Sequence, residues 1–337
     1  MKFFNIDFHI SVVADLQHIF TNLGHQFDDW CLSGHHWVLN KKKMDIPLLN
    51  GWEKIIDKQL WNDFADTYPE LEKYDAFVCT YPPVFAMLYN NFNKPIIIHI
   101  PIRYEHPFTQ NRKNWEIWNQ WLRDNMDSGK VIVACNSKFE KFYFESYVGR
   151  EAYYIPNLCE YTNMHYCPEK QPMVYHNNSL GMHFDNRRTV GTYKWNDLAK
   201  RRSLIHYPYQ VSTMSIFEQY TANIPLIFPS KEFTHNHPDM LHQVLWSKTT
   251  HQPADPPNCK VDWEKDWLDN VWLADYYQWP HIQYYDSIQH CMQIAGNMDE
   301  SAVYHGMKEE NFERHKYVYD TWQKIISDIS NWKGVVV

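Results

Sequence analysis

Two residues that can move a proton stand near the start of the chain, in Asp7-Phe8-His9, directly after a short apolar segment. A carboxylate, or an imidazole that titrates near neutral pH, can take the proton of a hydroxyl group as that group attacks another molecule. At this spacing the carboxylate can also hold the imidazole in one tautomer. We therefore expect a general base in this turn, supplied by Asp7 or by His9. The alternative is structural, with Asp7 capping the turn and His9 packed.

A second set of chemically capable residues follows the Ile-rich segment Pro95–Ile100. Arg103 can bind a phosphate or a hydroxyl group, and Glu105 is a further candidate for the general base. An ion pair at the protein surface would explain these two residues equally well. Both interpretations stay open at the level of the sequence.

The most informative stretch runs from residue 203 to residue 230, where a strand, a tight loop, the helix Ser212–Asn223 and a second strand follow one another. Three hydroxyl residues gather at the start of the helix: Ser212, Thr213 and Ser215. The free backbone N–H groups and the dipole of a helix start favour an anion. Glu218 lies about one and a half turns inside the helix, ahead of Pro225.

This stretch resembles the donor-binding segment of the GT-B glycosyltransferases. In that family a Glu precedes a small-x-Pro turn by the same spacing and accepts the ribose hydroxyls of a nucleotide. The matching residues are Ser215-Ile216-Phe217-Glu218 and Asn223-Ile224-Pro225-Leu226-Ile227. Families with a Glu-x7-Glu pair would have the first Glu at position 210, where this chain has Gln210. That departure points away from the retaining branch that uses the pair.

The resemblance implies an enzyme that moves a sugar from a nucleoside-diphosphate sugar to a hydroxyl group of a carbohydrate or glycan, with inversion at the anomeric carbon. Catalysis would fall to Asp7, His9 or Glu105. Donor binding would fall to Ser212, Thr213, Ser215, Glu218, His206, Tyr209, Arg188 and Lys194. Acceptor binding would fall to His35, Tyr81, Arg103 and Tyr104. The cationic side chains among them would stabilise the negative charge that develops on a diphosphate leaving group.

No Asp-x-Asp motif occurs, so we expect neither a required metal nor a cofactor beyond the donor substrate. A nucleotide-sugar epimerase of the same build is an alternative, because it would share the Glu218 site and need no acceptor. A non-catalytic protein that binds a ligand in a cleft is a third alternative. The sequence does not name the sugar, the base, the acceptor or the oligomeric state.

The elements that must position these residues alternate between strand and helix in both halves. In the first half we expect strands at Lys2–Ile6, Gln26–Leu32, Asp75–Thr80, Pro95–Ile100, Val131–Cys135 and Tyr153–Pro156. In the second half we expect them at Met173–His176, Leu204–Tyr207, Pro225–Phe228 and Ile282–Tyr285. Ser137-x-x-Glu140 has the form of a capping box at a helix start.

Such alternation predicts an α/β protein with two doubly wound, Rossmann-like domains facing a cleft, the GT-B type. We expect an acceptor-side domain at 1–165 and a donor-binding domain at 166–310. A C-terminal helix at 311–337 would then pack back on the N-terminal domain.

Composition narrows the range of partners. The net charge of −8 and the lack of a basic stripe argue against nucleic acid. No apolar run approaches the length of a membrane span, and the polar first twenty residues do not resemble a signal peptide. The seven cysteines form no CxxC pair, which favours reduced thiols and the cytoplasm.

Overall fold

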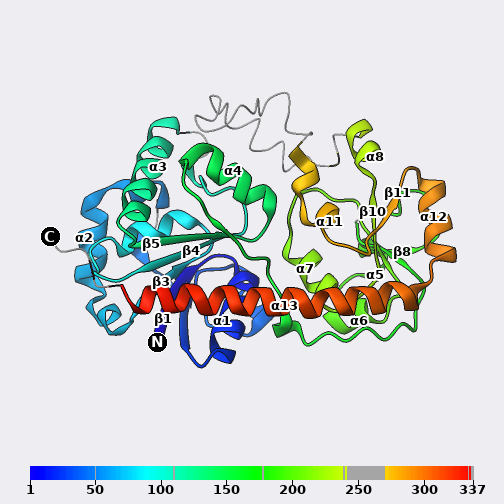
Figure 1. Ribbon diagram of the computed structural model, residues 1–337, viewed down its shortest axis with the longest axis horizontal. Coiled ribbons are helices and arrows are strands. Elements are labelled where there is room, and N and C mark those ends of the chain that lie inside the picture. The colour runs from blue at the N-terminus through cyan, green and yellow to red at the C-terminus, as the bar shows by residue number, and fades with distance from the viewer. Residues whose placement is uncertain are drawn as a thin grey trace. The chain divides into compact units, whose positions relative to one another are not determined.

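The computed structural model describes residues 1–49, 51–108, 111–176, 178–237, 240, 270–332 and 334. The chain forms two compact units; in Figure 1 the first is coloured from blue to green, with the red end of α13, and the second from green to orange. Unit 1 contains Met1–Asn157 and the chain from Val318 onward, and unit 2 is drawn from residues between Leu158 and Tyr317. Each unit holds one parallel sheet, which confirms the expected α/β class. Among the described residues, no helix combines the length and the apolar character that crossing a bilayer requires.

The sheet of unit 1 has six parallel strands in the order β2-β1-β3-β4-β5-β6. The strands are β1 Lys2–Asp7, β2 Gln26–Cys31, β3 Ala76–Cys79, β4 Ile96–Ile100, β5 Val131–Cys135 and β6 Tyr153–Tyr154. Each overlaps a segment that the sequence predicts as a strand. Every residue of β3 and β4 is buried. Burial on both faces of the sheet explains why these segments are apolar throughout, except for His99 in β4, instead of alternating.

Helices connect these strands and cover the sheet. They are α1 Ile10–Asn22, α2 Lys58–Thr67, α3 Arg112–Asp127 and α4 Lys138–Val148, with the 3₁₀ helix η5 at Pro83–Tyr89. The Ser137 side chain caps α4 by accepting the backbone N–H of Glu140 at 3.0 Å. The Glu140 carboxylate pairs with an arginine, described below. The structure therefore has the serine half of the predicted capping box. The Glu140 side chain pairs with the arginine and does not complete the box.

The sheet of unit 2 has five parallel strands in the order β11-β10-β9-β7-β8. They are β7 Met173–Val174, β8 Asp185–Asn186, β9 Leu204–Ile205, β10 Leu226–Pro229 and β11 Gln283–Tyr285. The helices are α5 Arg187–Val190, α6 Trp195–Ala199, α7 Met214–Thr221, α8 Lys231–Asn236, α11 Asp275–Gln278 and α12 Ile288–Asn297. The sequence analysis missed β8, because a strand of two polar residues carries no apolar pattern.

The last helix, α13, runs from Glu300 to Ser330 and is longer than the sequence predicts. Its earlier part belongs to unit 2, and its part from Val318 onward belongs to unit 1. In unit 1 Trp322 packs against Phe20 and His99, with ring centroids 5.3 and 5.5 Å apart. Aromatic packing of Trp322 thus ties the last turns of α13 into the core of unit 1.

Both sheets reverse their strand order at one point. In unit 1 the order changes direction between β1 and β3, and in unit 2 between β7 and β9. In open parallel sheets, ligands bind beyond the carboxyl ends of the strands at such a switch point. Functional side chains are therefore expected where β1, β3, β7 and β9 end.

Candidate functional site

Asp7 joins the two strands at the switch point of unit 1. It ends β1, is 2% exposed, and accepts three hydrogen bonds through its carboxylate. The donors are the hydroxyl of Thr80, the backbone N–H of Tyr81 at 2.6 Å, and the backbone N–H of His9. Burial raises the pKa of Asp7 well above its usual value, and the two backbone donors oppose that rise. Asp7 therefore fixes the turn that carries His9, through the backbone of His9 and not through its imidazole.

The imidazole of His9 stands at the start of α1 and is half-buried. Its ring meets the Tyr81 ring edge-on, with centroids 6.3 Å apart. Its Nδ1 is buried and has no hydrogen-bond partner among the described residues. Burial lowers the pKa of His9, so the ring is neutral at pH 7 and can accept a proton. Of the two residues in this turn, His9 has the acceptor capacity that a general base needs.

Arg103 and Glu105 follow β4 and are buried, so the interpretation as a surface ion pair is wrong. The partner of Arg103 is Glu140 of α4, with Nη1 and Oε1 2.8 Å apart and side chains 4% and 1% exposed. The guanidinium also lies over the Phe139 ring, 5.4 Å from its centroid. Glu105 accepts a hydrogen bond from the hydroxyl of Tyr143 at 3.1 Å. Arg103 therefore holds the β4 loop against α4, a structural role that differs from the predicted acceptor binding.

Tyr104, also expected to bind the acceptor, belongs to the core. Its hydroxyl donates to Asn119 at 2.7 Å and accepts from the indole of Trp115 at 2.9 Å, both on α3. A third contact runs from the Trp118 indole to the Tyr104 carbonyl at 3.2 Å. The sequence analysis took Tyr104 for a site residue because it follows a strand end, but its side chain points into the α3 packing.

Tyr81 and His35 remain open to a ligand. Tyr81 follows β3, is half-buried, and stacks on the His106 ring with centroids 5.4 Å apart. His35 is exposed in the turn after β2, where its backbone N–H donates to the Ser33 hydroxyl at 3.1 Å. Unit 1 therefore brings Asp7, His9 and Tyr81 together at its switch point.

Glu105 makes folding stability depend on pH. Burial raises its pKa to about 7, from 4.5 for an unperturbed Glu. The folded protein thus keeps a proton that the unfolded chain releases, so stability is lost as pH rises from 4.5 through 7. Glu105→Gln stays neutral at every pH. We therefore expect its free energy of unfolding, relative to that of wild type, to increase by roughly 1–3 kcal/mol when the pH is raised from 4.5 to 8.

Urea unfolding at pH 4.5, 6, 7 and 8 measures this difference. Glu116→Gln, at an exposed position of α3, is the matched control and should show no such trend. A difference that is constant with pH would contradict the assignment to Glu105.

Glu218 is the central carboxylate of unit 2. It lies on α7, which follows β9, and it is 8% exposed. Its Oε1 accepts the hydroxyl of Tyr161 at 2.7 Å, and its Oε2 accepts the indole N–H of Trp195 at 3.2 Å. The two rings meet edge to face with centroids 5.6 Å apart. Glu218 is therefore not an ordinary solvated helix residue, and as a buried carboxylate it needs such donors.

The start of α7 offers donors to an anion. Thr213 occupies the N-cap position and makes no side-chain cap bond; its Oγ1 lies 3.1 Å from Oγ of Ser215. The hydroxyl of Ser212 is buried and has no partner among the described residues. Backbone N–H groups of the first turn that lack a cap can bind an anionic ligand. The three hydroxyl residues singled out in the sequence therefore gather where a diphosphate can bind.

Of the two adjacent arginines, Arg187 is the one that faces the aromatic residues at the sheet edge. Its guanidinium lies 4.9 Å from the Tyr175 ring centroid and 5.8 Å from that of Tyr193. The hydroxyls of these tyrosines are 2.8 Å apart. Arg188 and Lys194, the predicted donor ligands, have exposed side chains, and their backbone N–H groups take part in capping α5 and α6. The sequence alone does not distinguish the two arginines, because they are the same residue type at adjacent positions.

His206 and Tyr209 also have unequal surroundings. His206 is buried, stacks on Phe228 at 4.4 Å, and its Nε2 lies 2.7 Å from Oε1 of Gln219. Burial lowers its pKa to about 3, so the ring stays neutral. His206 therefore packs within unit 2 as a neutral side chain. Tyr209 is 37% exposed, in contrast to His206.

The structure places Tyr161, Trp195 and Arg187 around Glu218 and its neighbours, and none of them is among the donor-binding residues proposed from the sequence. The only signal was the aromatic content of 17%. Spacing along the chain could not connect them, because Tyr161 and Glu218 are 57 residues apart.

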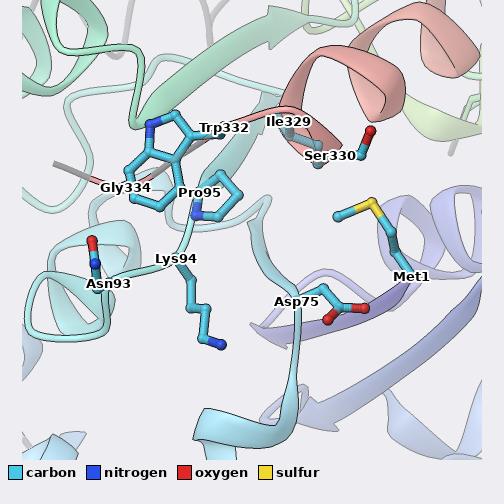
Figure 2. A pocket seen from close by; sticks show the side chains of 9 residues that line it. All are labelled: Met1, Asp75, Asn93, Lys94, Pro95, Ile329, Ser330, Trp332 and Gly334. Carbon is cyan, nitrogen blue, oxygen red and sulfur yellow. The ribbon is translucent and has the colours of Figure 1, made fainter.

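A cavity of about 490 Å³ lies at the opposite edge of the unit 1 sheet (Figure 2). Its lining residues are Met1, Asp75, Asn93, Lys94, Pro95, Ile329, Ser330, Trp332 and Gly334. Asp75 and Pro95 directly precede β3 and β4, so this is the amino edge. The catalytic candidates stand at the carboxyl edge, and the cavity is separate from them. In the described part of the chain, no three His, Cys, Asp or Glu side chains gather as a metal site would require.

Comparison with known proteins gives structural matches alone. No protein-family model and no curated protein matches the chain. It is similar to the glycosyltransferase SnogD from Streptomyces nogalater, with 10% identity, a TM-score of 0.45, and coverage of 97% of this chain and 99% of that one. It is similar to the glycotransferase of kitacinnamycin, with 9% identity, a TM-score of 0.44, and coverage of 96% and 98%. The S. aureus MnaA structure with UDP matches at 11% identity and a TM-score of 0.36, covering 80% and 98%.

Proposed function

We propose that this protein is a glycosyltransferase that moves a sugar from a nucleoside-diphosphate sugar to a hydroxyl group of a carbohydrate or glycan. It works in the cytoplasm, where its cysteines stay reduced. The six in the described part of the chain are free thiols. The donor binds unit 2 and the acceptor binds unit 1. No metal takes part, and cationic and backbone donors of unit 2 stabilise the diphosphate.

One observation carries the proposal: a buried carboxylate, an uncapped helix start and an arginine meet at the switch point of unit 2. Glu218 can accept the ribose hydroxyls, because a carboxylate accepts hydrogen bonds only. The start of α7, with Ser212, can take the diphosphate. Arg187 supplies the cation near Tyr175. A nucleoside diphosphate would present its ribose hydroxyls to the carboxylate and its diphosphate to the helix start and the arginine.

For the mechanism we propose inversion, with His9 of unit 1 as the general base. The neutral imidazole takes the acceptor proton while the hydroxyl oxygen attacks the anomeric carbon and the nucleoside diphosphate leaves. Gln210 supports inversion, because its side chain accepts the backbone N–H of Val211 at 3.0 Å where the retaining pair would have a Glu.

Glu218→Ala tests the donor site. We expect nucleotide binding to weaken roughly 10- to 150-fold, the value of a buried hydrogen bond to a charged group. Titration calorimetry with UDP, GDP, ADP and CDP measures it, after a thermal melt shows that the variant is folded. The matched control is Glu232→Ala, at an exposed position of α8, which should bind as wild type does. Equal affinities of folded Glu218→Ala and wild type would refute the assignment.

The alternatives predict other products. A transferase slowly releases nucleoside diphosphate from its donor even when no acceptor is present, while a binding protein releases none. An epimerase shares the Glu218 site but changes the sugar of its substrate without an acceptor. Chromatography of a nucleotide sugar incubated with the protein, with and without acceptor glycans, separates the three.

A further inference from the structure

Glu218 already has two hydrogen-bond donors from its own unit. Tyr161 donates its hydroxyl to Oε1 and Trp195 donates its indole N–H to Oε2, so one neutral donor serves each oxygen. At 8% exposure the carboxylate has little contact with water. A buried carboxylate without hydrogen-bond donors is unfavourable, so these two contacts hold the Glu218 side chain in place.

The two donors come from short elements. Tyr161 lies in the 3₁₀ helix η7, Glu160–Thr162, and Trp195 is the first residue of α6, which has five residues. Neither side chain is fully buried. Short surface elements of this kind rearrange at a lower free-energy cost than core strands. Tyr161 and Trp195 can therefore leave the carboxylate without disturbing the sheet.

We propose that Tyr161 and Trp195 are positioning residues that hold Glu218 in the empty protein and give way to the 2′- and 3′-hydroxyls of a ribonucleotide. The inference rests on the proposed function and deepens it. A vicinal diol offers two neutral donors, one to replace Tyr161 and one to replace Trp195, so binding exchanges this pair of hydrogen bonds for another. A 2′-deoxyribonucleotide replaces one donor alone, and the site favours ribonucleoside diphosphates.

Tyr161→Phe tests the exchange, because it removes the hydroxyl and keeps the ring. Without this competitor, the ribonucleoside diphosphate that binds wild type best should bind about three- to tenfold more tightly, the net value of one hydrogen bond. Tyr166→Phe makes the same chemical change at a hydroxyl that donates to the Arg202 carbonyl, and it should bind as wild type does. Unchanged or weaker binding by Tyr161→Phe overturns the proposal, because the hydroxyl would then be neutral or a ligand of the nucleotide.

The wild-type protein provides a second readout, which is valid even if Tyr161→Phe does not fold. Trp195→Phe identifies the indole N–H resonance of Trp195 in a spectrum of the ¹⁵N-labelled protein. Saturation with the ribonucleotide should move this proton upfield, as a lost hydrogen bond does, and its 2′-deoxy analogue should bind more weakly. A resonance that keeps its hydrogen-bonded position at saturation overturns the exchange.

The two proposals fail in different ways. If none of the four ribonucleoside diphosphates binds wild type, the proposed function is wrong and the exchange falls with it. If one binds, and Glu218→Ala weakens it while the Tyr161 and Trp195 readouts stay unchanged, only the exchange is overturned.

Discussion

Replacing His9 with alanine is expected to lower kcat by about 10²–10⁴-fold while donor binding persists, because the substitution removes the proton acceptor and leaves unit 2 intact. The lowered pKa of His9 adds a pH dependence. The base is active when neutral, so wild-type turnover should fall as pH drops below that pKa, which lies under 6.5. Turnover with the donor identified by nucleotide-sugar screening measures both effects, and nucleotide titration measures binding.

His25→Ala is the matched control, since His25 precedes β2 at the amino edge of the same sheet. It should keep wild-type turnover. Near-normal turnover of folded His9→Ala would place the base elsewhere. Asp7→Asn is expected to lower folding stability first, because Asp7 accepts three hydrogen bonds, two of which tie β1 to the residues after β3. If Asp7→Asn is folded and inactive while His9→Ala turns over, Asp7 is the base. If both variants keep near-normal turnover, Glu105 is the next candidate to test. Retention of the anomeric configuration in the product would contradict inversion in any case.

Replacing Arg103 with methionine is expected to lower the free energy of unfolding by roughly 3–5 kcal/mol, because it leaves the buried Glu140 carboxylate without its cation. Burial already raises the pKa of Glu140, and Arg103 opposes that rise. Removing Arg103 therefore leaves two buried carboxyls, Glu140 and Glu105, that fold best when protonated. The loss should be smaller near pH 5 than at pH 8. Urea unfolding at both pH values measures it.

The double variant Arg103→Met with Glu140→Met should recover much of this loss, since apolar side chains of similar volume replace buried ion pairs at little cost. Asp127→Asn breaks an exposed pair with Arg150 and should have a small effect. If Arg103→Met alone is as stable as the double variant, an unpaired Glu140 carboxylate is not what destabilises the protein, and the prediction is contradicted.

The alternating pattern of the sequence was enough to predict the fold class and most of its strands. Apolar runs such as Pro95–Ile100 have few other uses, because a buried parallel strand is apolar on both faces. Glu218 and the hydroxyl residues of α7 were predictable for a similar reason, since a helix start and its spacing to Pro225 are local properties. β8 was not predictable, because two residues pair there through backbone groups alone.

Only the tertiary structure decided which candidates are buried in packing and which are exposed. Arg103 and Tyr104 follow a strand end as site residues do, yet both turn into packing against α3 and α4. Arg187 and Arg188 are adjacent in the sequence, but it is the Arg187 guanidinium that lies over the rings of Tyr175 and Tyr193. Tyr161 and Trp195 reach Glu218 from distant positions in the chain. The sequence determined what each segment can form, because propensity and periodicity are local. The direction of a side chain depends on neighbours that only folding brings together.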